Sequence, residues 1–418
     1  DFILIGSKGN GEAQAIFNLY SDGAITNRDD WIYNASRSTL VDNVKSMIRY
    51  FDVERERYKS SGGDTDPARF VRGDETKIKW DDKLLGHIKR DRKLTFRDEC
   101  LVPVVYRPFS KQWMYFDKTC IWSAYQMPRI FPAGSGSKNL AICTSGVGAK
   151  KDFFALMVDS IIDRGMNSAG KAFPLYAMEA NDHEANEGDA PGLFAGGKVT
   201  VLDTITDAGA RHFTSAYVGE NIGKEDVFYY IYGLFHSQDY PERYADNLSK
   251  ELPRIPRVRT AKDFWHFSKA GRTLADLHLN YETVERYPLT IDSKGKLTDA
   301  DYRVEQMKFA KKKDPGTGKS VNDRSIVIYN NKITLSGIPE AAWNYVVNGK
   351  AALDWVMERQ AVRVDKASGI VNDANDWAIE TMGNPKYPLE LFQRVVTVSL
   401  ETQKIVNALP RLEIREDG

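Results

Sequence analysis

The segment "DVFYYIYGLFHSQDYPERYADNLSKEL", residues 226–252, decides the fold class, because it predicts a block of helices in a chain whose earlier part favours strands. The apolar residues that recur at helical spacing on one face are Val227, Tyr230, Ile231, Leu234 and Phe235. Pro241 favours the first turn of a second helix. Thr260, with Asp263 three residues later, predicts the N-cap of a third helix.

The region before this block favours β-strands. Residues 94–122 carry Val, Tyr, Phe and Trp in short runs that Pro103 and Pro108 interrupt, which suits a mixed or antiparallel sheet. "NLAICTSG", residues 139–146, predicts another strand that runs into a loop. The opening "DFILIG" also predicts a strand, whereas the apolar spacing from Ala13 to Tyr58 is mostly helical.

The last third of the chain returns to strands and then to helices. "SIVIYNNKITL", residues 325–335, predicts a hairpin centred on Asn330 and Asn331, because Asn tolerates the left-handed backbone of a two-residue turn. Pro339 is expected to open a helix that Asn348 and Gly349 interrupt, and a second helix is expected over residues 351–360. A final long helix is predicted from Pro388 to Pro410.

Together these patterns predict an α+β protein, with a β-rich domain, a helical block and a C-terminal region of hairpin plus helices. The turn-rich "SSGGDTDP" at residues 60–67 marks a boundary, and residues 179–197 are expected to form an exposed connection. The predicted division is a linker and helical segment over residues 1–68, a β-rich recognition domain over residues 69–222 and a C-terminal part over residues 223–418.

Charge is balanced over the whole chain but not along it. The 58 basic and 58 acidic residues argue against a protein that binds polyanions over its entire surface. Residues 77–171, however, hold seventeen Lys and Arg against nine Asp and Glu, a formal charge of +8, and residues 172–226 have a charge of −7. These runs are either solvated faces or an electrostatic footprint for a phosphate backbone followed by an acidic linker.

The sequence gives little support for a metal-binding protein, a disulfide-stabilised protein or a membrane protein. Three cysteines without CxxC spacing predict neither a zinc site nor a disulfide framework, and a reducing cytoplasm suits them. The six histidines show no metal-binding spacing, and no apolar run could span a bilayer, so we expect neither a metal nor a membrane partner. The chain starts at Asp1 without a signal peptide, which we interpret as a piece of a longer protein.

Two glycine-rich segments could suggest a nucleotide site. Gly6, Gly9 and Gly11 have GxxGxG spacing, whereas a dinucleotide fingerprint requires GxGxxG. "GTGKS" at residues 316–320 lacks the first glycine of a phosphate loop, because Lys313 stands in its place, so an exposed loop is expected there. No NPPY-like tetrapeptide or other catalytic motif is present. A free-standing enzyme that uses a nucleotide or S-adenosylmethionine at the first loop remains an alternative.

One segment combines groups that suit DNA. After the strand at residues 139–143, Thr144 and Ser145 enter a small-residue loop in which backbone amides and hydroxyls can approach a phosphate. Lys150 and Lys151 supply positive charge, while Arg164 and Asn167 offer forked donors of the kind that read base edges. The alternative is a surface loop with solvated lysines.

Seven phrases, in this order, resemble a known family: "TNRDDWIYN" (26–34), "YRPFSKQW" (106–113), "AKKDFFAL" (149–156), "FPLY" (173–176), "YIYGLFHSQDYPERYADNLSKELPRIP" (230–256), "NGKAALDWVMERQ" (348–360) and "SGIVNDANDW" (368–377). With them the chain resembles the C-terminal specificity region of type ISP restriction enzymes, which is related in layout to single-chain type IIG enzymes. The resemblance covers nearly the whole chain.

The resemblance implies a target recognition domain that follows a nuclease, an ATP-driven translocase and an adenine N6-methyltransferase in a longer parent. The implied partners are double-stranded DNA and the methyltransferase and helicase-like domains of that parent. S-adenosylmethionine, ATP and Mg would belong to the parent, and no cofactor is expected in this chain. We expect phosphate contacts from Arg107, Lys111, Lys150 and Lys151, and contacts nearer the bases from Thr144, Ser145, Arg164 and Asn167. A scaffold that couples protein domains is a further alternative.

Overall fold

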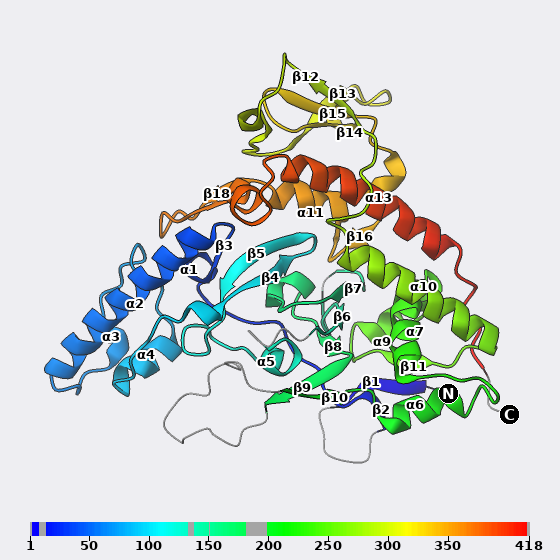
Figure 1. Ribbon diagram of the computed structural model, residues 1–418, viewed down its shortest axis with the longest axis horizontal. Coiled ribbons are helices and arrows are strands. Elements are labelled where there is room, and N and C mark those ends of the chain that lie inside the picture. Colours follow the sequence, from blue (N-terminus) through cyan, green and yellow to red (C-terminus); the bar gives the residue numbers. More distant parts are fainter. Residues whose placement is uncertain (1, 8–13, 133–137, 150, 181–198, 416–418) are drawn as a thin grey trace.

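The computed structural model describes residues 2–7, 14–132, 138–149, 151–180 and 199–415. Figure 1 shows a triangular outline, with α2 along one side, two small central sheets, a helical corner and a four-stranded sheet at the apex. The α+β prediction is confirmed. The exposed connection expected at residues 179–197 and the loop from Gly6 to Gly11 fall largely outside the described residues.

The first side of the triangle is built on α2 (Arg37–Ser60). Ser36 caps this helix by accepting a hydrogen bond from the Thr39 amide, and Leu40, Val44 and Phe51 face the core. The helical prediction is wrong between Ala13 and α2, where the structure has β2 (Ala15–Phe17), α1 (Asp29–Ile32) and β3 (Tyr33–Asn34). The reason is tertiary, because β2 pairs in parallel with β1 (Phe2–Gly6), which itself pairs with β11 (Arg254–Pro256). The side ends in α3 (Pro67–Phe70) and α4 (Asp82–Lys89).

The predicted strands of the middle region are present as small antiparallel sheets. β4 (Leu101–Arg107) and β5 (Ser110–Tyr115) form a hairpin with β3 at its edge, although the run from Leu94 to Phe96 is not a strand. A second sheet has the order β7-β6-β8, with β6 (Ala141–Thr144) between β7 (Ala155–Val158) and β8 (Ala172–Pro174). The other elements here are α5 (Met127–Ile130), β9 (Tyr176–Ala180) and β10 (Val199–Asp203).

The helical block is confirmed as α7 (Lys224–His236) and α10 (Ala261–Leu279), with Thr260 as the N-cap of α10. The two helices approach closely because Gly233 and Gly271 lie at their crossing, where a Cβ on either residue would overlap the backbone of the other helix. The helix expected after Pro241 is split into α8 (Asp239–Arg243) and α9 (Ala245–Leu248). The corner also contains α6 (Asp207–Thr214).

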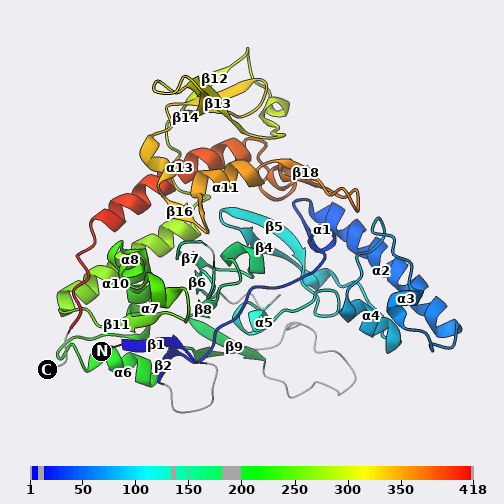
Figure 2. The same ribbon diagram turned by 180° about the vertical axis from the view of Figure 1, so that it is seen from behind.

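The C-terminal region holds the predicted hairpin within the apical sheet, whose order is β12-β15-β14-β13. The expected left-handed two-residue turn is wrong, because neither Asn330 nor Asn331 has a positive φ and the strands are joined over residues 329–332. Its strands are β12 (Thr290–Ser293), β13 (Lys308–Lys313), β14 (Ser320–Ile328) and β15 (Ile333–Ser336). Seen from behind in Figure 2, this sheet stands above α11 (Ala352–Arg359) and α13 (Tyr387–Asn407), both of which match the predicted helices. Other elements here are β18 (Val362–Val364), β19 (Val371–Asp373) and α12 (Ala374–Asp376), with a short π-helix at Trp377–Thr381.

The helix expected from Pro339 is wrong. A 3-10 turn, Glu340–Trp343, leads instead into a tight hairpin of β16 (Val346–Val347) and β17 (Lys350–Ala351). Asn348 and Gly349 have φ angles of 50° and 74°, so the pair forms the two-residue turn of a hairpin and not a helix end.

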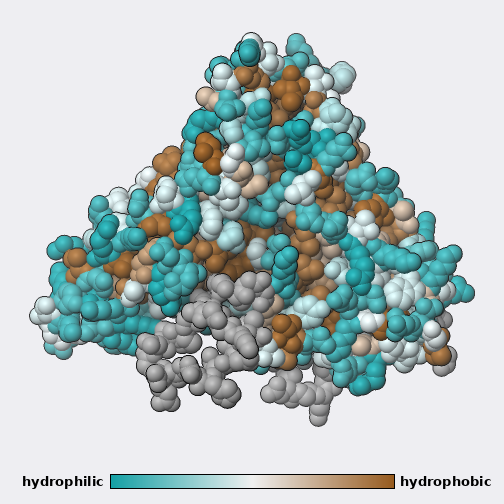
Figure 3. Space-filling view, viewed as in Figure 1, coloured by the Kyte–Doolittle hydropathy of each residue, from teal (hydrophilic) through white to brown (hydrophobic). Residues whose placement is uncertain are grey.

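Two hydrophobic cores hold these elements together. One joins α2, the β4–β5 hairpin and α13, and the other joins β1, β8, α7 and α10. Each core draws residues from all three predicted segments, so the linear division into 1–68, 69–222 and 223–418 stays a prediction. In Figure 3 hydrophilic side chains cover much of the molecule's corners. No helix in the described ranges has the length and apolarity needed to cross a bilayer.

Candidate nucleic-acid interface

Two of the predicted site loops lie side by side. The loop after β6 and the turn before β8 lie at the same end of these two neighbouring strands. The Thr144 amide donates a hydrogen bond to the Lys171 carbonyl at 2.9 Å. A Cβ on Gly170 would overlap the carbonyl of Thr144, and a Cβ on Gly146 would lie 2.7 Å from the carbonyl oxygen of Ala169. Backbone therefore packs on backbone, which only glycine allows at these two positions.

The turn of the β16–β17 hairpin completes this arrangement. The Asn348 side-chain amide donates to the carbonyl of Met166 at 2.9 Å and to that of Gly165 at 3.3 Å. Its side-chain oxygen accepts a hydrogen bond from the Ser168 hydroxyl, and its backbone carbonyl accepts one from Lys151 Nζ at 3.0 Å. We call residues 145–149, 151–152, 164–170 and 347–350 the loop junction.

The structure places the four predicted base contacts in different environments. Thr144 and Asn167 are both 0% exposed, and the Thr144 hydroxyl and both polar atoms of the Asn167 amide have no hydrogen-bond partner among the described residues. In this conformation neither side chain can reach a base. Ser145 is half-buried and Arg164 is exposed, so both remain candidates for contact with DNA.

Three of the side chains predicted to contact phosphate already bond other residues of the chain. Lys111 pairs with Glu282 at 2.6 Å, Lys151 is bonded to Asn348, and Arg107 pairs with Asp163. Of these three side chains only Lys151 belongs to an exposed residue. The fourth, Lys150, lies outside the described residues. The assigned roles stay predictions, and each of the three contacts would require the existing bond to be exchanged.

Arg107 belongs to a largely buried polar cluster beside the loop junction. Asp163 accepts hydrogen bonds from Arg107, from the Gly165 amide at 2.7 Å and from Tyr33 at 3.2 Å. Burial and the nearby Asp29 carboxylate raise the pKa of Asp163 to about 6, although Arg107 acts in the opposite direction. The Arg107 guanidinium also lies 3.9 Å from the centre of the Tyr106 ring.

A second group of cations gathers around Glu358, which we call the Glu358 cluster. Glu358 pairs with Lys350, with Arg359 at 2.8 Å and with Arg363 at 3.4 Å, so three cations share one carboxylate. Burial and the neighbouring charges of Arg107 and Arg363 lower the pKa of Arg359, as expected where like charges converge. Such a surplus of positive charge favours an anion.

Sequence reasoning missed the Glu358 cluster as a site. The signal was present, since Lys350, Glu358 and Arg359 lie within the family phrase "NGKAALDWVMERQ". The cluster adjoins the predicted residues, because Arg359 and Arg107 both lie against the Tyr106 ring, with Arg359 at 5.7 Å from its centre.

The cations of residues 77–171 are dispersed. Four of them, Lys89, Arg90, Arg92 and Lys93, lie at or just after the end of α4, which Figure 1 places at a corner away from the central sheets. Others pair locally, as Arg97 does with Asp117 and Lys171 with Asp22. The charge of +8 therefore does not mark one surface.

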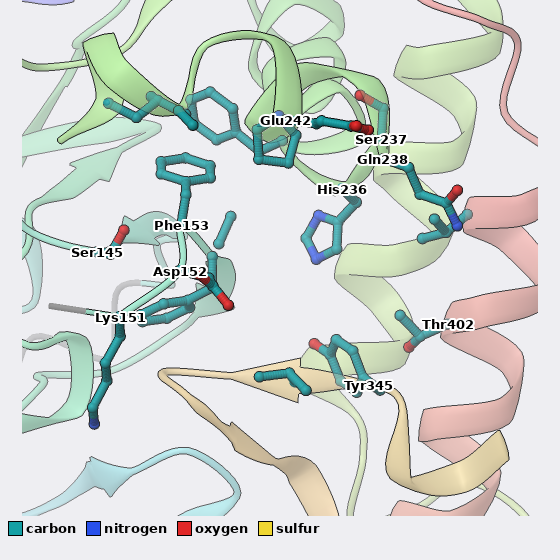
Figure 4. A pocket seen from close by; sticks show the side chains of 18 of the residues that line it. Ser145, Lys151, Asp152, Phe153, His236, Ser237, Gln238, Glu242, Tyr345 and Thr402 are labelled. Carbon is teal, nitrogen blue, oxygen red and sulfur yellow. The ribbon is translucent and has the colours of Figure 1, made fainter. Parts of the chain in front are cut away.

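A large pocket borders the loop junction (Figure 4). Its volume is about 980 Å³, and its walls come from the loop after β6, the start of α8, the β16 hairpin and α13. Figure 4 shows His236 and Asp152 projecting into the space, whereas the ammonium group of Lys151 points away from it. Ser145 also lines this pocket, whose walls hold both charged and aromatic residues.

The phrases that carry the family resemblance contact one another. Asn34 donates to the Val371 carbonyl at 3.0 Å, and Asn372 bonds both the Ala35 amide at 3.1 Å and the Gln112 side chain at 3.2 Å. These contacts join three phrases that are distant in sequence. The bond from Lys151 to Asn348 joins two more of them. The shared residues therefore hold the framework on which the exposed side chains stand.

Comparison with known proteins identifies the class to which this α+β framework belongs. The chain matches the model of the type ISP C-terminal specificity domain over residues 15–391. It therefore belongs to the family of type ISP C-terminal specificity domains.

Solved structures agree with this assignment. The chain is 32% identical to the type ISP restriction-modification enzyme LlaGI, solved as a nuclease-deletion mutant with a DNA substrate mimic, with a TM-score of 0.80. It is 31% identical to the ATP-dependent type ISP enzyme LlaBIII bound to DNA, with a TM-score of 0.82, and 29% identical to DrdV in a DNA complex, with a TM-score of 0.78. Each similarity covers 99% of this chain but only 34%, 24% and 38% of the respective enzymes. No curated protein is similar enough to count as a match.

Proposed function

We propose that this chain recognises a specific sequence in double-stranded DNA, as the specificity region of a restriction-modification enzyme. The observation that carries the proposal is the similarity over 99% of the chain to enzymes solved with DNA, at 31–32% identity for the two type ISP enzymes. The specificity-domain family offers no support for the alternative of a free-standing enzyme that uses a nucleotide or S-adenosylmethionine.

The proposed contact surface consists of the exposed part of the loop junction and the Glu358 cluster. Arg164 projects from the first, while Lys350, Arg359 and Arg363 lie in the second. Arginine can bond two acceptors on a guanine edge at once, and a good bidentate contact gives about 1–3 kcal/mol of discrimination. The Arg107–Asp163 pair contacts both parts of this surface, through the Gly165 amide and through the Tyr106 ring that Arg107 shares with Arg359.

The chemistry of the parent protein is also a proposal. The parent would methylate adenine at N6 and cleave unmodified DNA with ATP, using S-adenosylmethionine, ATP and Mg bound to its other domains in the cytoplasm. This chain would dock against the methyltransferase and helicase-like domains, which would close the other side of the duplex.

The test is to select bound sequences from a pool of random duplexes with the 418-residue chain. We expect a single enriched motif, together with a loss of affinity for it in Arg164→Ala and Arg363→Ala. Arg92→Ala is the matched control, because Arg92 is exposed at the end of α4. Equal effects of all three variants would contradict the assigned surface, and no enrichment by the wild-type chain would contradict the function.

A scaffold that couples protein domains is the second candidate, since the cations of residues 77–171 are dispersed. For such a scaffold, the chain would bind its parent's other domains equally well with and without DNA and would enrich no sequence.

A further inference from the structure

The apical sheet carries a two-stranded extension with an unusual charge. β13 pairs only with β14. β15 pairs with residues 326–328 of β14, so the first six residues of β14, 320–325, extend beyond β15. Beyond a bulge after Phe309, Ala310–Lys313 pair with Ser320–Asp323 without a third strand. We call residues 310–323 the lysine ribbon. Residues 308–324 hold six Lys and Arg against two Asp.

The lysine ribbon is built on a fixed base. At the bulge, the Arg324 carbonyl accepts a hydrogen bond from the Trp343 indole at 3.0 Å, and the Ser325 carbonyl accepts one from the Ile338 amide at 3.2 Å. The Arg324 guanidinium lies 5.2 Å from the centre of the Trp343 ring. These contacts fix the direction in which the strands leave the sheet.

One face of the ribbon is entirely cationic and polar. Cross-strand partners share a face, so Lys311 and Lys313 stand beside Asn322 and Ser320, while Lys312 and Asp323 occupy the opposite face. Within the described chain, no carboxylate lies within ion-pair distance of Lys311, Lys313 or Lys319. Of the two acidic side chains, Asp314 accepts from the Thr317 amide in the turn between the strands. Asp323 accepts from the Ser325 amide opposite the bulge and pairs with Lys312 at 3.4 Å.

Lysines often protect a sheet edge from pairing with another chain. That role explains charge on β13 but not the continuation of β14, because residues 311–322 include no buried residue and add nothing to either core. An ordered strand pair that buries nothing costs conformational entropy, which suggests that a partner covers it. The major groove of B-DNA admits a two-stranded ribbon, and lysines match its phosphates.

We infer that the lysine ribbon binds the backbone of duplex DNA through Lys311 and Lys313, as a contact separate from the loop junction and the Glu358 cluster. The inference rests on the proposed function. Removing two lysines that each neutralise one phosphate lowers the magnitude of the slope of log affinity against log salt concentration by about 2. At 0.1 M salt the same counterion release corresponds to about a five- to tenfold loss of affinity for each contact.

The experiment compares Lys311→Ala/Lys313→Ala with Lys294→Ala/Lys296→Ala in the 418-residue chain. The control pair has the same charge change in the loop that follows β12 of the same sheet, and all four lysines are exposed, so folding should be unaffected. Salt-dependent affinity for a long duplex should show a slope lower by about 2 only in the ribbon variant.

Three results would overturn the inference. An equally reduced slope in both variants would show a general charge effect. A slope in the ribbon variant that equals the wild-type slope would point to an acidic protein surface as the partner. If wild-type chain binds no duplex DNA, the proposed function fails first and the inference fails with it.

Discussion

The side-chain amide of Asn348 donates a hydrogen bond of 2.9 Å to the backbone carbonyl of Met166, joining two turns that lie 182 residues apart. Asn348 is 1% exposed and has a φ of 50°. One residue therefore both shapes the β16–β17 turn and fixes the loop junction.

Asn348→Ala should destabilise the chain by about 2–3 kcal/mol, because buried carbonyl groups lose their donor. Asn348→Gly should cost about 1 kcal/mol less, since glycine adopts a positive φ without strain. Chemical denaturation measures both, with Asn344→Ala as an exposed control. Equal losses for Ala and Gly would show that turn geometry contributes nothing.

Thr144→Val should leave DNA affinity unchanged and raise the free energy of unfolding by up to about 1 kcal/mol, because valine has the same shape and removes a buried hydroxyl without a partner. The measurement combines denaturation with duplex binding. A loss of affinity at unchanged stability would instead show that Thr144 turns outward to contact DNA.

Asp163 should make stability depend on pH in the direction opposite to most carboxylates. Its folded pKa of about 6 lies above the ordinary value of 3.8, so the folded state holds the proton longer. The resulting stabilisation is complete below pH 4 and is lost as the pH rises through 6, a change on the order of 3 kcal/mol.

Subtracting the unfolding free energies of Asp163→Asn from those of the wild type between pH 4 and pH 8 isolates this contribution. The difference should fall with increasing pH and become flat above pH 7. A difference that rises with pH would mean that the ion pair with Arg107 dominates over burial.

His278 should oppose folding in acid. Its ring nitrogens bond the Tyr232 hydroxyl at 2.6 Å and the Thr402 hydroxyl at 2.8 Å, and burial, with the nearby His236, lowers its pKa well below 6.5. Because the Tyr232 oxygen already accepts from the Met157 amide, its proton points at His278 and favours the neutral ring. A lowered histidine pKa stabilises the fold above pH 6.5, and the stabilisation is lost as the pH falls.

We expect His278→Gln to reduce the loss of stability between pH 7 and pH 5 by about 2 kcal/mol, the effect of one proton over 1.5 pH units. Denaturation at each pH measures it. His266→Gln, at an exposed position, is the matched control for the loss of an imidazole. An unchanged profile for His278→Gln would assign the acid sensitivity to other groups.

Local patterns in the sequence determined much of the secondary structure. The apolar spacing of residues 227–235 and the cap at Thr260 predicted α7 and α10, and Asn330–Asn331 predicted the turn between β14 and β15. These signals involve residues within a few positions of each other, so they can be read without knowledge of the rest of the chain.

Only the tertiary structure decided which side chains are free to act. It buried Thr144 and Asn167, paired Arg107 with Asp163 and Lys111 with Glu282, and gathered Lys350, Arg359 and Arg363 around Glu358. The two ion pairs join residues 56 and 171 positions apart in the chain. The availability of a charge is set by its neighbours in space, and the order of residues along the chain does not reveal them.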